Sequence, residues 1–350
     1  MQTKILKINS ADIDTASMQE AAALIRAGEL VAFPTETVYG LGADALRPEA
    51  SGKIYEAKGR PSDNPLIVHI ADFRQLARIA GELPRQAKIL SDAFWPGPLT
   101  MIVWKNESVP FETTGGLNTV AVRMPNHPVA LRLIEESGCL IAAPSANISG
   151  RPSPTDAGHV ALDMDGKIPL ILDGGAVGIG IESTIIDLTE ETPLILRPGY
   201  ITKEMLERAL GQEVRTDPAI TGADEGGRPK APGMRYKHYA PKAELVLVEG
   251  ESEAVVAHIN RLSKERIKAG QRVGVIATDE TLAAYASKDA VSIGARADED
   301  AIARHLYRIL REFDERDVDI IYSESFATPR IGQAIMNRLL KAAGHQVIKV

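Results

Sequence analysis

Short apolar runs and helical patterns alternate along the first part of the chain. A short apolar run bounded by proline, glycine or polar residues is typical of a buried strand, whereas apolar positions at i, i+3 and i+4 indicate an amphipathic helix. The alternation, with too many strands for a helical bundle, predicts a mixed α/β domain over residues 1–212. The expected strands are 30–33, 66–70, 99–104, 119–124, 140–143, 170–172, 184–188 and 194–197, and the expected helices are 49–58, 72–80, 128–137 and 202–210.

A further helix is expected before the first of these strands. Ser17 and Glu20 have the spacing of a capping box, in which each side chain accepts a hydrogen bond from the other residue's backbone N–H. Gly28 follows the apolar pattern and suits the position just past a helix end, where the backbone often takes a positive φ. The helix is therefore predicted to begin at Ser17 and to end at Gly28.

The periodicity fails over residues 213–243. This segment contains four prolines and four glycines, which predicts an extended linker. Residues 244–350 return to strands separated by helices and predict a smaller Rossmann-like α/β domain with a parallel sheet. Its expected strands are 245–248, 272–277, 290–293 and 318–323, and the inner face of one helix is marked by Ile302, Leu306, Ile309, Leu310 and Phe313.

Composition and charge narrow the possible functions. The chain has 350 residues, with 40 Lys+Arg against 47 Asp+Glu, and its net charge of −7 argues against a protein that binds nucleic acid through overall positive charge. The single cysteine, Cys139, cannot form an internal disulfide, which favours a reducing, cytoplasmic location. No run of 18 apolar residues and no apolar leader segment occurs, so no membrane association is expected.

Several common catalytic motifs are missing from the sequence. There is no GxxxxGK[ST] loop for nucleotide phosphates, no HExxH or paired cysteines for zinc, and no GxSxG nucleophile turn. The glycine-rich run at residues 174–180 does not match GxGxxG and is interpreted as a flexible loop between strands. A nucleotide, if bound, must therefore be held by other means.

Four cations stand where apolar elements end and polar loops begin. Lys58 and Arg60 flank the glycine that ends an expected helix, and Arg123 and Arg197 each end an expected strand. Arginine at the end of a buried strand is costly to desolvate unless an anion faces it. The four cations, together with nearby Ser, Thr and Asn side chains, predict a cleft for a ligand with several negative groups, such as ATP. Two plainer explanations stay open, namely that Lys58 and Arg60 only complement a helix dipole and that each arginine has a structural carboxylate partner.

Seven segments give the chain a family resemblance. In this order and spacing they resemble the threonylcarbamoyl-AMP synthases, the YrdC-like proteins, and the linker motif APGMRYKHYAP with the C-terminal domain resembles the long, two-domain form. The segments are PTETVYGLG (34–42), KGRPSDNPL (58–66), WPGPLT (95–100), VAVRMP (120–125), PSANISG (144–150), ESTIID (182–187) and LRPG (196–199).

The resemblance implies a fold and a reaction. The fold is a twisted mixed sheet with a concave, positively lined cavity. The reaction converts L-threonine, bicarbonate and ATP into threonylcarbamoyl-AMP, diphosphate and water. A downstream tRNA threonylcarbamoyl transferase complex then uses the product to modify the adenosine next to the anticodon. Since the intermediate is handed on, this role requires no stable binding of nucleic acid by the chain itself.

The resemblance also implies roles for residues at matching positions. Lys58 and Arg60 are the expected catalytic residues, Mg²⁺ is expected to bind mainly through the ATP phosphates, and no protein metal site or general base is identified. The expected L-threonine contacts are Thr35, His69, Arg123 and Ser183. The expected ATP contacts are Lys58, Arg60, Asn64, Thr119, Ser145, Asn147, Ser153, Arg197 and Tyr236.

Two further expectations concern the linker and rival functions. The resemblance implies that the linker, with Tyr236, folds back over the active site, although a solvated tether would have the same composition. The C-terminal domain is assigned no chemistry. One alternative function is an RNA-binding module that uses the basic cavity. Another is a carbamoyltransferase-related activity, but the hydrogenase-maturation proteins that have it carry cysteine-rich zinc fingers, which a chain with one cysteine cannot form.

Overall fold

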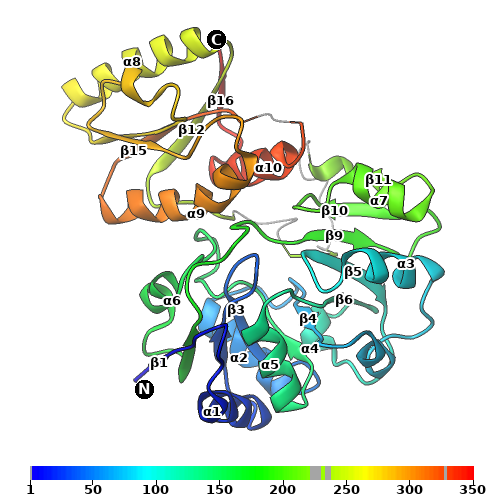
Figure 1. Ribbon diagram of the computed structural model, residues 1–350. Coiled ribbons are helices and arrows are strands. Elements are labelled where there is room, and N and C mark those ends of the chain that lie inside the picture. Colours follow the sequence, from blue (N-terminus) through cyan, green and yellow to red (C-terminus); the bar gives the residue numbers. More distant parts are fainter. Residues whose placement is uncertain (1, 221–229, 233–237, 327–328) are drawn as a thin grey trace. The chain divides into compact units, whose positions relative to one another are not determined.

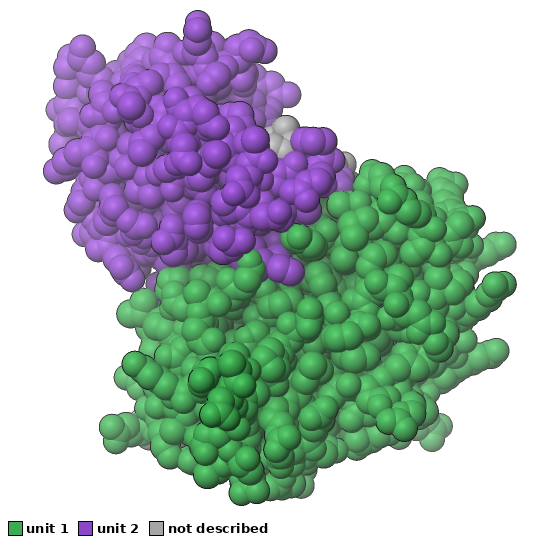
Figure 2. Space-filling model, in the orientation of Figure 1, with its two compact units in different colours: residues 1–149, 153–178, 182–235 green, residues 150–152, 179–181, 236–350 purple. Residues whose placement is uncertain are grey.

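The computed structural model describes residues 2–220, 230–232, 238–326 and 329–350. These residues form two compact units, which Figure 2 colours separately. Unit 1 comprises residues 1–149, 153–178 and 182–235, and unit 2 comprises residues 150–152, 179–181 and 236–350. Two short segments from the middle of the sequence thus belong to the same compact unit as the C-terminal residues.

Unit 1 is built on one mixed sheet of eleven strands (Figure 1). The sheet contains both parallel pairs, such as β4 with β6, and antiparallel pairs, such as β5 with β6, so the expected mixed α/β fold is confirmed. In order across the sheet the strands are β1 (Lys4–Lys7), β8 (Leu170–Asp173), β2 (Val31–Phe33), β3 (Gly40–Asp44), β7 (Ile141–Ala142), β4 (Ile67–His69), β6 (Thr119–Arg123), β5 (Leu99–Trp104), β9 (Thr184–Asp187), β10 (Leu194–Arg197) and β11 (Arg215–Thr216).

Helices cover both faces of this sheet. Successive side chains of a strand point to opposite faces, and in β2 Val31 and Phe33 join one buried cluster while Ala32 joins the other. The Val31 cluster includes residues of α1 and α5, which pack against each other (Figure 1). The helices of unit 1 are α1 (Thr15–Arg26), α2 (Pro48–Lys58), α3 (Arg85–Phe94), α4 (Phe111–Thr114), α5 (Pro128–Ser137), α6 (Ala157–Met164) and α7 (Lys203–Leu210), with a 3₁₀ helix at Phe73–Arg78.

The start of α1 differs from the sequence expectation. The Ser17–Glu20 capping box is wrong, because Asp14 lies earlier in the chain and its carboxylate accepts the hydrogen bond from the Ser17 backbone nitrogen at 2.8 Å. Glu20 instead pairs with Lys4 of β1 at 2.8 Å. The helix end agrees with the prediction, since Gly28 has a φ of +78° and donates its N–H to Ile25.

Unit 2 contains a five-stranded parallel sheet, as expected for a Rossmann-like domain. The five apolar positions marked in the sequence are all buried on α9, and Phe313 packs so closely on β13 that a Cβ at Gly274 would lie 2.7 Å from its ring. The strands, in order across the sheet, are β14 (Asp289–Ser292), β13 (Val273–Ala277), β15 (Ile320–Glu324), β12 (Glu244–Glu249) and β16 (Val347–Lys349), and the helices are α8 (Ser252–Lys268), α9 (Glu299–Glu315) and α10 (Gly332–Ala342), with a 3₁₀ helix at Leu282–Ala284.

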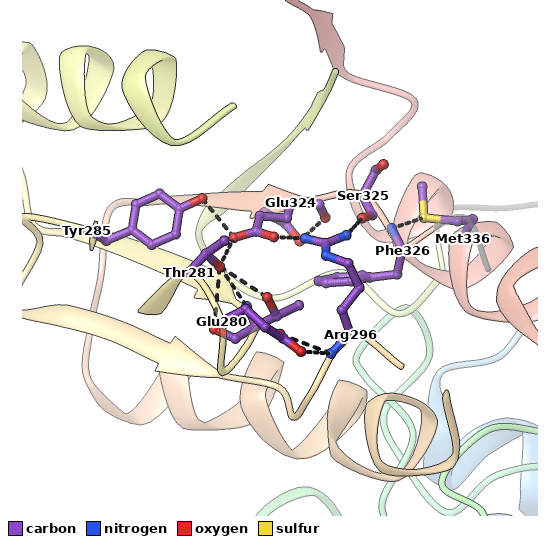
Figure 3. Close-up of polar contacts among 10 residues, drawn as sticks. Glu280, Thr281, Tyr285, Arg296, Glu324, Ser325, Phe326 and Met336 are labelled. Atoms are coloured by element: carbon purple, nitrogen blue, oxygen red, sulfur yellow. Dashed lines mark hydrogen bonds and ion pairs between the residues drawn. The ribbon is translucent and has the colours of Figure 1, made fainter. Parts of the chain in front are cut away.

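A buried carboxylate organises the carboxyl edge of this second sheet (Figure 3). Glu324, the last residue of β15, is only 2% exposed and accepts hydrogen bonds from Thr281 and from the Tyr285 hydroxyl, the latter at 2.8 Å. The Arg296 guanidinium pairs with the same carboxylate, donates to the Ser325 carbonyl at 3.1 Å and lies over the Phe326 ring. These partners satisfy a buried charge and fix the loops that follow β13 and β14.

Within the part of the chain that the structure describes, no helix is both long and apolar enough to span a lipid bilayer.

Candidate active site

Strand pairing brings part of the predicted threonine site together. His69 at the end of β4 pairs with Arg123 at the end of β6, and Arg123 pairs on its other side with Thr100 of β5. Residues paired on adjacent strands point to the same face of a sheet. The Thr100 hydroxyl lies 2.8 Å from the hydroxyl of Ser183, which immediately precedes β9. Arg123, His69 and Ser183 are therefore neighbours, although they are far apart in sequence.

Arg123 is buried and its guanidinium binds groups from two other segments. Nη2 lies 2.6 Å from Oε2 of Glu36, Nη1 donates to the Thr37 hydroxyl at 2.9 Å, and Nε donates to the Gly97 carbonyl at 3.4 Å. Glu36 is thus a carboxylate partner of Arg123, which is one of the two plainer explanations that the sequence left open. Thr35 joins the same group, because its hydroxyl lies 2.9 Å from that of Thr37.

His69 is enclosed and uncharged. Its Nδ1 lies 3.1 Å from the Ile67 carbonyl oxygen, and its ring meets the Phe33 ring edge-on. Burial, and secondarily the positive charge of Arg123, lowers the pKa of His69 to about 3. At neutral pH the imidazole can therefore make neutral hydrogen bonds but cannot serve as a cation for a carboxylate or phosphate.

Arg197, a predicted ATP contact, is hydrogen-bonded to Ser183, a predicted threonine contact. Its Nε donates to the Ser183 carbonyl at 3.0 Å, and its Nη2 donates to the Ser183 hydroxyl at 3.2 Å. The turn after β10 approaches this segment so closely that a Cβ on Gly199 would lie 2.4 Å from the Thr184 backbone nitrogen. Only glycine allows the LRPG segment to pack here, which holds Arg197 against Ser183.

Lys58 and Arg60 hold two other predicted segments together. Lys58 ends α2, is 2% exposed, and donates hydrogen bonds to the carbonyls of Ser145 and Asn147. Arg60 lies just past Gly59, whose φ is +60°, and donates to the carbonyls of Asn64 at 3.1 Å and Pro65 at 3.0 Å. The two cations thus bind carbonyls of the KGRPSDNPL and PSANISG segments, which goes beyond complementing the dipole of α2.

The other predicted ATP contacts are placed as follows. Oδ1 of Asn64 is buried and has no hydrogen-bond partner among the described residues, and the Ser153 hydroxyl donates to the buried carboxylate of Glu182 at 2.5 Å. Thr119 begins β6 and Arg123 ends it, so at about 3.3 Å per residue the two lie roughly 13 Å apart along the strand. Thr119 is therefore not a neighbour of Arg123. Tyr236 lies outside the described residues.

Sequence reasoning missed two carboxylates in these segments. Glu36 lies in PTETVYGLG and Glu182 in ESTIID, and the carboxylate of each is buried against a predicted site residue. Their place in the quoted motifs was the available signal. It was insufficient, because an acidic residue in a polar turn is usually exposed to solvent.

Residues 230–232 of the linker pack on the sheet of unit 1. Ala231 is fully buried in a cluster with Ile67 of β4, Ala121 of β6 and Leu196 of β10. The carbonyl of Pro232 accepts a hydrogen bond from Arg197 Nη1 at 3.3 Å. Residues 230–232 therefore contact an arginine of the candidate site directly.

A cavity of about 640 Å³ is lined in part by Lys58. Its lining includes Glu29, Lys53, Glu56 and Lys167, but Lys58 is the one predicted ATP contact among its lining residues. The cavity is therefore not the space that the predicted ATP contacts would share. Within the described ranges, no group of three or more His, Cys, Asp and Glu side chains is placed to hold a metal ion.

Comparison with known proteins decides the family. Residues 23–199 match the Sua5, YciO and YrdC family model, described as "Telomere recombination", and residues 201–344 match the model of the threonylcarbamoyl-AMP synthase C-terminal domain. The threonylcarbamoyl-AMP synthase of Bacillus subtilis (strain 168) is 53% identical over 331 residues, which cover 94% of each chain. The chain belongs to the threonylcarbamoyl-AMP synthase family.

Other similarities extend over the whole two-domain synthase. The threonylcarbamoyl-AMP synthase of Pyrococcus abyssi (strain GE5 / Orsay) is 52% identical over 330 residues, 94% of this chain and 95% of that protein. The crystal structure of P. abyssi Sua5 complexed with L-threonine matches with a TM-score of 0.94 and 50% identity, over 99% of this chain and 100% of that chain. Escherichia coli YciO, at 23% identity and a TM-score of 0.52 over 56% of this chain, shares the fold of the first part. The family resemblance inferred from the seven segments is thus confirmed.

Proposed function

We propose that this chain catalyses the reaction of L-threonine, bicarbonate and ATP to threonylcarbamoyl-AMP, diphosphate and water. The observation that carries the proposal is the near full-length similarity to synthases, including one whose structure holds L-threonine. The clustering of Arg123, Ser183 and Arg197 supports it, because a threonine site and an ATP site must share an edge for the two substrates to react.

In the threonine part of the site, one cation and several neutral groups bind the carboxylate and the hydroxyl. Arg123 binds the carboxylate of L-threonine, since a buried guanidinium offers paired donors that match a carboxylate. Ser183, Thr35 and neutral His69 provide short-range hydrogen bonds for the hydroxyl and orient the amino acid. A fixed orientation is the main requirement, because attack of an amine on bicarbonate-derived CO₂ gains several kcal/mol from positioning alone.

The ATP part of the site must stabilise a departing diphosphate. The carbamate oxygen attacks the α-phosphorus, and negative charge then builds up on the β- and γ-phosphates. Lys58, Arg60 and Arg197 supply preorganised positive charge there. The remaining donors proposed for the nucleotide are Asn64, Thr119, Ser145, Asn147, Ser153 and Tyr236.

Magnesium fits this set of donors as a companion of ATP. The proposed phosphate contacts are cations, amides and hydroxyls, whereas Mg²⁺ prefers anionic oxygens and keeps several waters. We therefore place the ion mainly on the phosphates, where it would neutralise part of their charge.

The linker is proposed to close the site. Residues 230–232 already lie against the strands that carry His69 and Arg123, and Pro232 bonds to Arg197. A closed segment at this point would exclude water from a hydrolysable adenylate.

The product is proposed to pass to a tRNA threonylcarbamoyl transferase complex. With a net charge of −7, the chain need not itself hold tRNA.

The experiment that tests the proposed function is diphosphate release from ATP, measured with L-threonine and bicarbonate each left out. Salt-sensitive tRNA binding without turnover would instead favour the RNA-binding alternative.

A further inference from the structure

Glu36 carries a buried carboxylate that the roles above do not use. Both carboxylate oxygens are inaccessible to solvent, and Oε2 lies 2.6 Å from Nη2 of Arg123. Neither oxygen accepts a hydrogen bond from any residue that the structure describes, so Oε2 makes an ion pair with Arg123 and Oε1 has no such contact. A buried anion with an unused oxygen is costly, and most buried polar groups are fully hydrogen-bonded. A carboxylate that served only to neutralise Arg123 would be expected to have both oxygens occupied.

The surroundings of Glu36 leave few other partners for that oxygen. Among the described residues, His127, just before α5, also faces Glu36, and its buried Nδ1 has no hydrogen-bond partner there either. Burial lowers the pKa of His127, against the opposing effect of the Glu36 charge. The glycine-rich loop 174–178, which passes close to the backbone of Glu36, contains no ionisable residue. His69, which is paired with Arg123 across the neighbouring strands, is neutral.

The Glu36–Arg123 pair matches the charges of an α-amino acid. An α-ammonium and an α-carboxylate are joined through one carbon, so their charged atoms lie about 3 Å apart. A buried guanidinium and a carboxylate in contact at 2.6 Å present the complementary charges with a similar spacing.

We propose that Glu36 binds the α-ammonium of L-threonine and accepts the proton released when the carbamate forms. The inference rests on the proposed function. Threonine ammonium and bicarbonate give the N-carboxylate, water and one proton. Two N–H bonds break, a C–N bond forms, and the bicarbonate hydroxyl leaves as water with one of the two nitrogen protons, while the other proton is released. The ammonium must lose a proton before its nitrogen can attack, and the unpartnered Oε1 of Glu36 is the acceptor beside Arg123. Glu36 thereby acts as the base that the sequence did not reveal.

The test compares the full-length wild-type chain with Glu36→Gln, which keeps the size of the side chain and removes its charge. At pH 7 the kcat/KM for L-threonine, followed by diphosphate release, should fall about 100-fold or more, while the KM for ATP changes less than threefold. The defect should shrink as pH rises towards 9, because more threonine then carries a free amine. Glu49→Gln, the same change at an exposed position of α2, should leave all three quantities unchanged. Wild-type kcat/KM and pH dependence in Glu36→Gln would overturn the inference.

A second measurement does not depend on a variant that folds. Wild-type protein should bind L-threonine at least tenfold more tightly than (R)-3-hydroxybutanoate, which lacks only the amino group, in a titration at pH 7. Equal affinities would overturn the role of Glu36. If wild-type protein releases diphosphate without needing threonine and bicarbonate, the proposed function itself fails, and this outcome is distinct from both results above.

Discussion

His69 and Arg123 occupy paired positions on the adjacent parallel strands β4 and β6. A permanent cation thus lies beside an enclosed imidazole, and burial with this charge lowers the pKa of His69 to about 3. The arrangement makes Arg123 the charged member of the predicted threonine site and keeps His69 neutral.

The pairing predicts a pH dependence of stability. A histidine in the unfolded chain titrates near pH 6.5, so between pH 6.5 and 3 the unfolded chain binds a proton that the folded chain excludes. As the pH is lowered through this window, His69 alone should reduce the free energy of unfolding by about 1.4 kcal/mol per pH unit. Denaturant unfolding of wild type and His69→Gln at several pH values between 4.5 and 7 should therefore give a shallower dependence for the variant. Parallel curves would show that His69 is protonated in the folded chain.

Removal of the charge of Lys58 or of Arg197 should slow catalysis strongly. Loss of a preorganised charge that faces the transition state typically lowers rates by about 10²- to 10³-fold. Lys58→Ala and Arg197→Ala should therefore reduce diphosphate release by that factor, with the fold retained by circular dichroism. Since Lys58 also binds two carbonyls, Lys58→Ala should lower the melting temperature as well.

A control variant distinguishes loss of a phosphate-site charge from the general effect of replacing a cation by alanine. Lys88 lies on the exposed face of α3 and pairs with Asp92, so Lys88→Ala should change neither rate nor stability appreciably. Full activity in both Lys58→Ala and Arg197→Ala would contradict the proposed placement of ATP.

Replacement of glycine by alanine should have opposite effects at Gly199 and at Gly52. In Gly199→Ala the new Cβ would meet the Thr184 backbone nitrogen at 2.4 Å, so the LRPG turn must move away from Ser183 and both activity and stability should fall. In Gly52→Ala the Cβ meets nothing within 4 Å on the exposed side of α2, and the helix should gain about 1 kcal/mol. Thermal unfolding with parallel rate measurements checks both. An active, stable Gly199→Ala variant would show that Arg197 needs no close contact with Ser183.

The linker segment gives a further prediction. Ala231 is fully buried on the sheet, so Ala231→Arg should lift residues 230–232 and break the bond from Arg197 to Pro232. If this segment closes the active site, adenylate should escape or hydrolyse and diphosphate release should fall tenfold or more. Lys230→Ala, which removes partly exposed ion pairs with Asp187 and Glu190, is the control and should stay active. Unchanged turnover in Ala231→Arg would make the linker a tether.

The sequence predicted most buried elements of the sheet, because their apolar runs are continuous. It did not reveal β3, whose glycines at 40 and 42 are unusual in a strand. The structure supplies the reason, since a Cβ on Gly42 would lie 2.6 Å from the Phe33 ring and neighbouring side chains fill that space. Strand β1 was missed because most of its residues are exposed.

The arginines of the candidate site could be predicted from the sequence, but the residues that pair with them could not. The arginines were found because a cation at the end of an apolar strand is conspicuous. That Arg123 pairs with Glu36, and that Arg197 bonds to Ser183, depends on strand register and on the close turn at Gly199. Such relationships join residues that no local pattern connects.

The most direct test of the proposed function is diphosphate release from ATP by the purified full-length chain. The reaction should require both L-threonine and bicarbonate, and the omission of either should reduce release to the background rate. Release that continues at the full rate without threonine, or without bicarbonate, would contradict the assignment as a threonylcarbamoyl-AMP synthase.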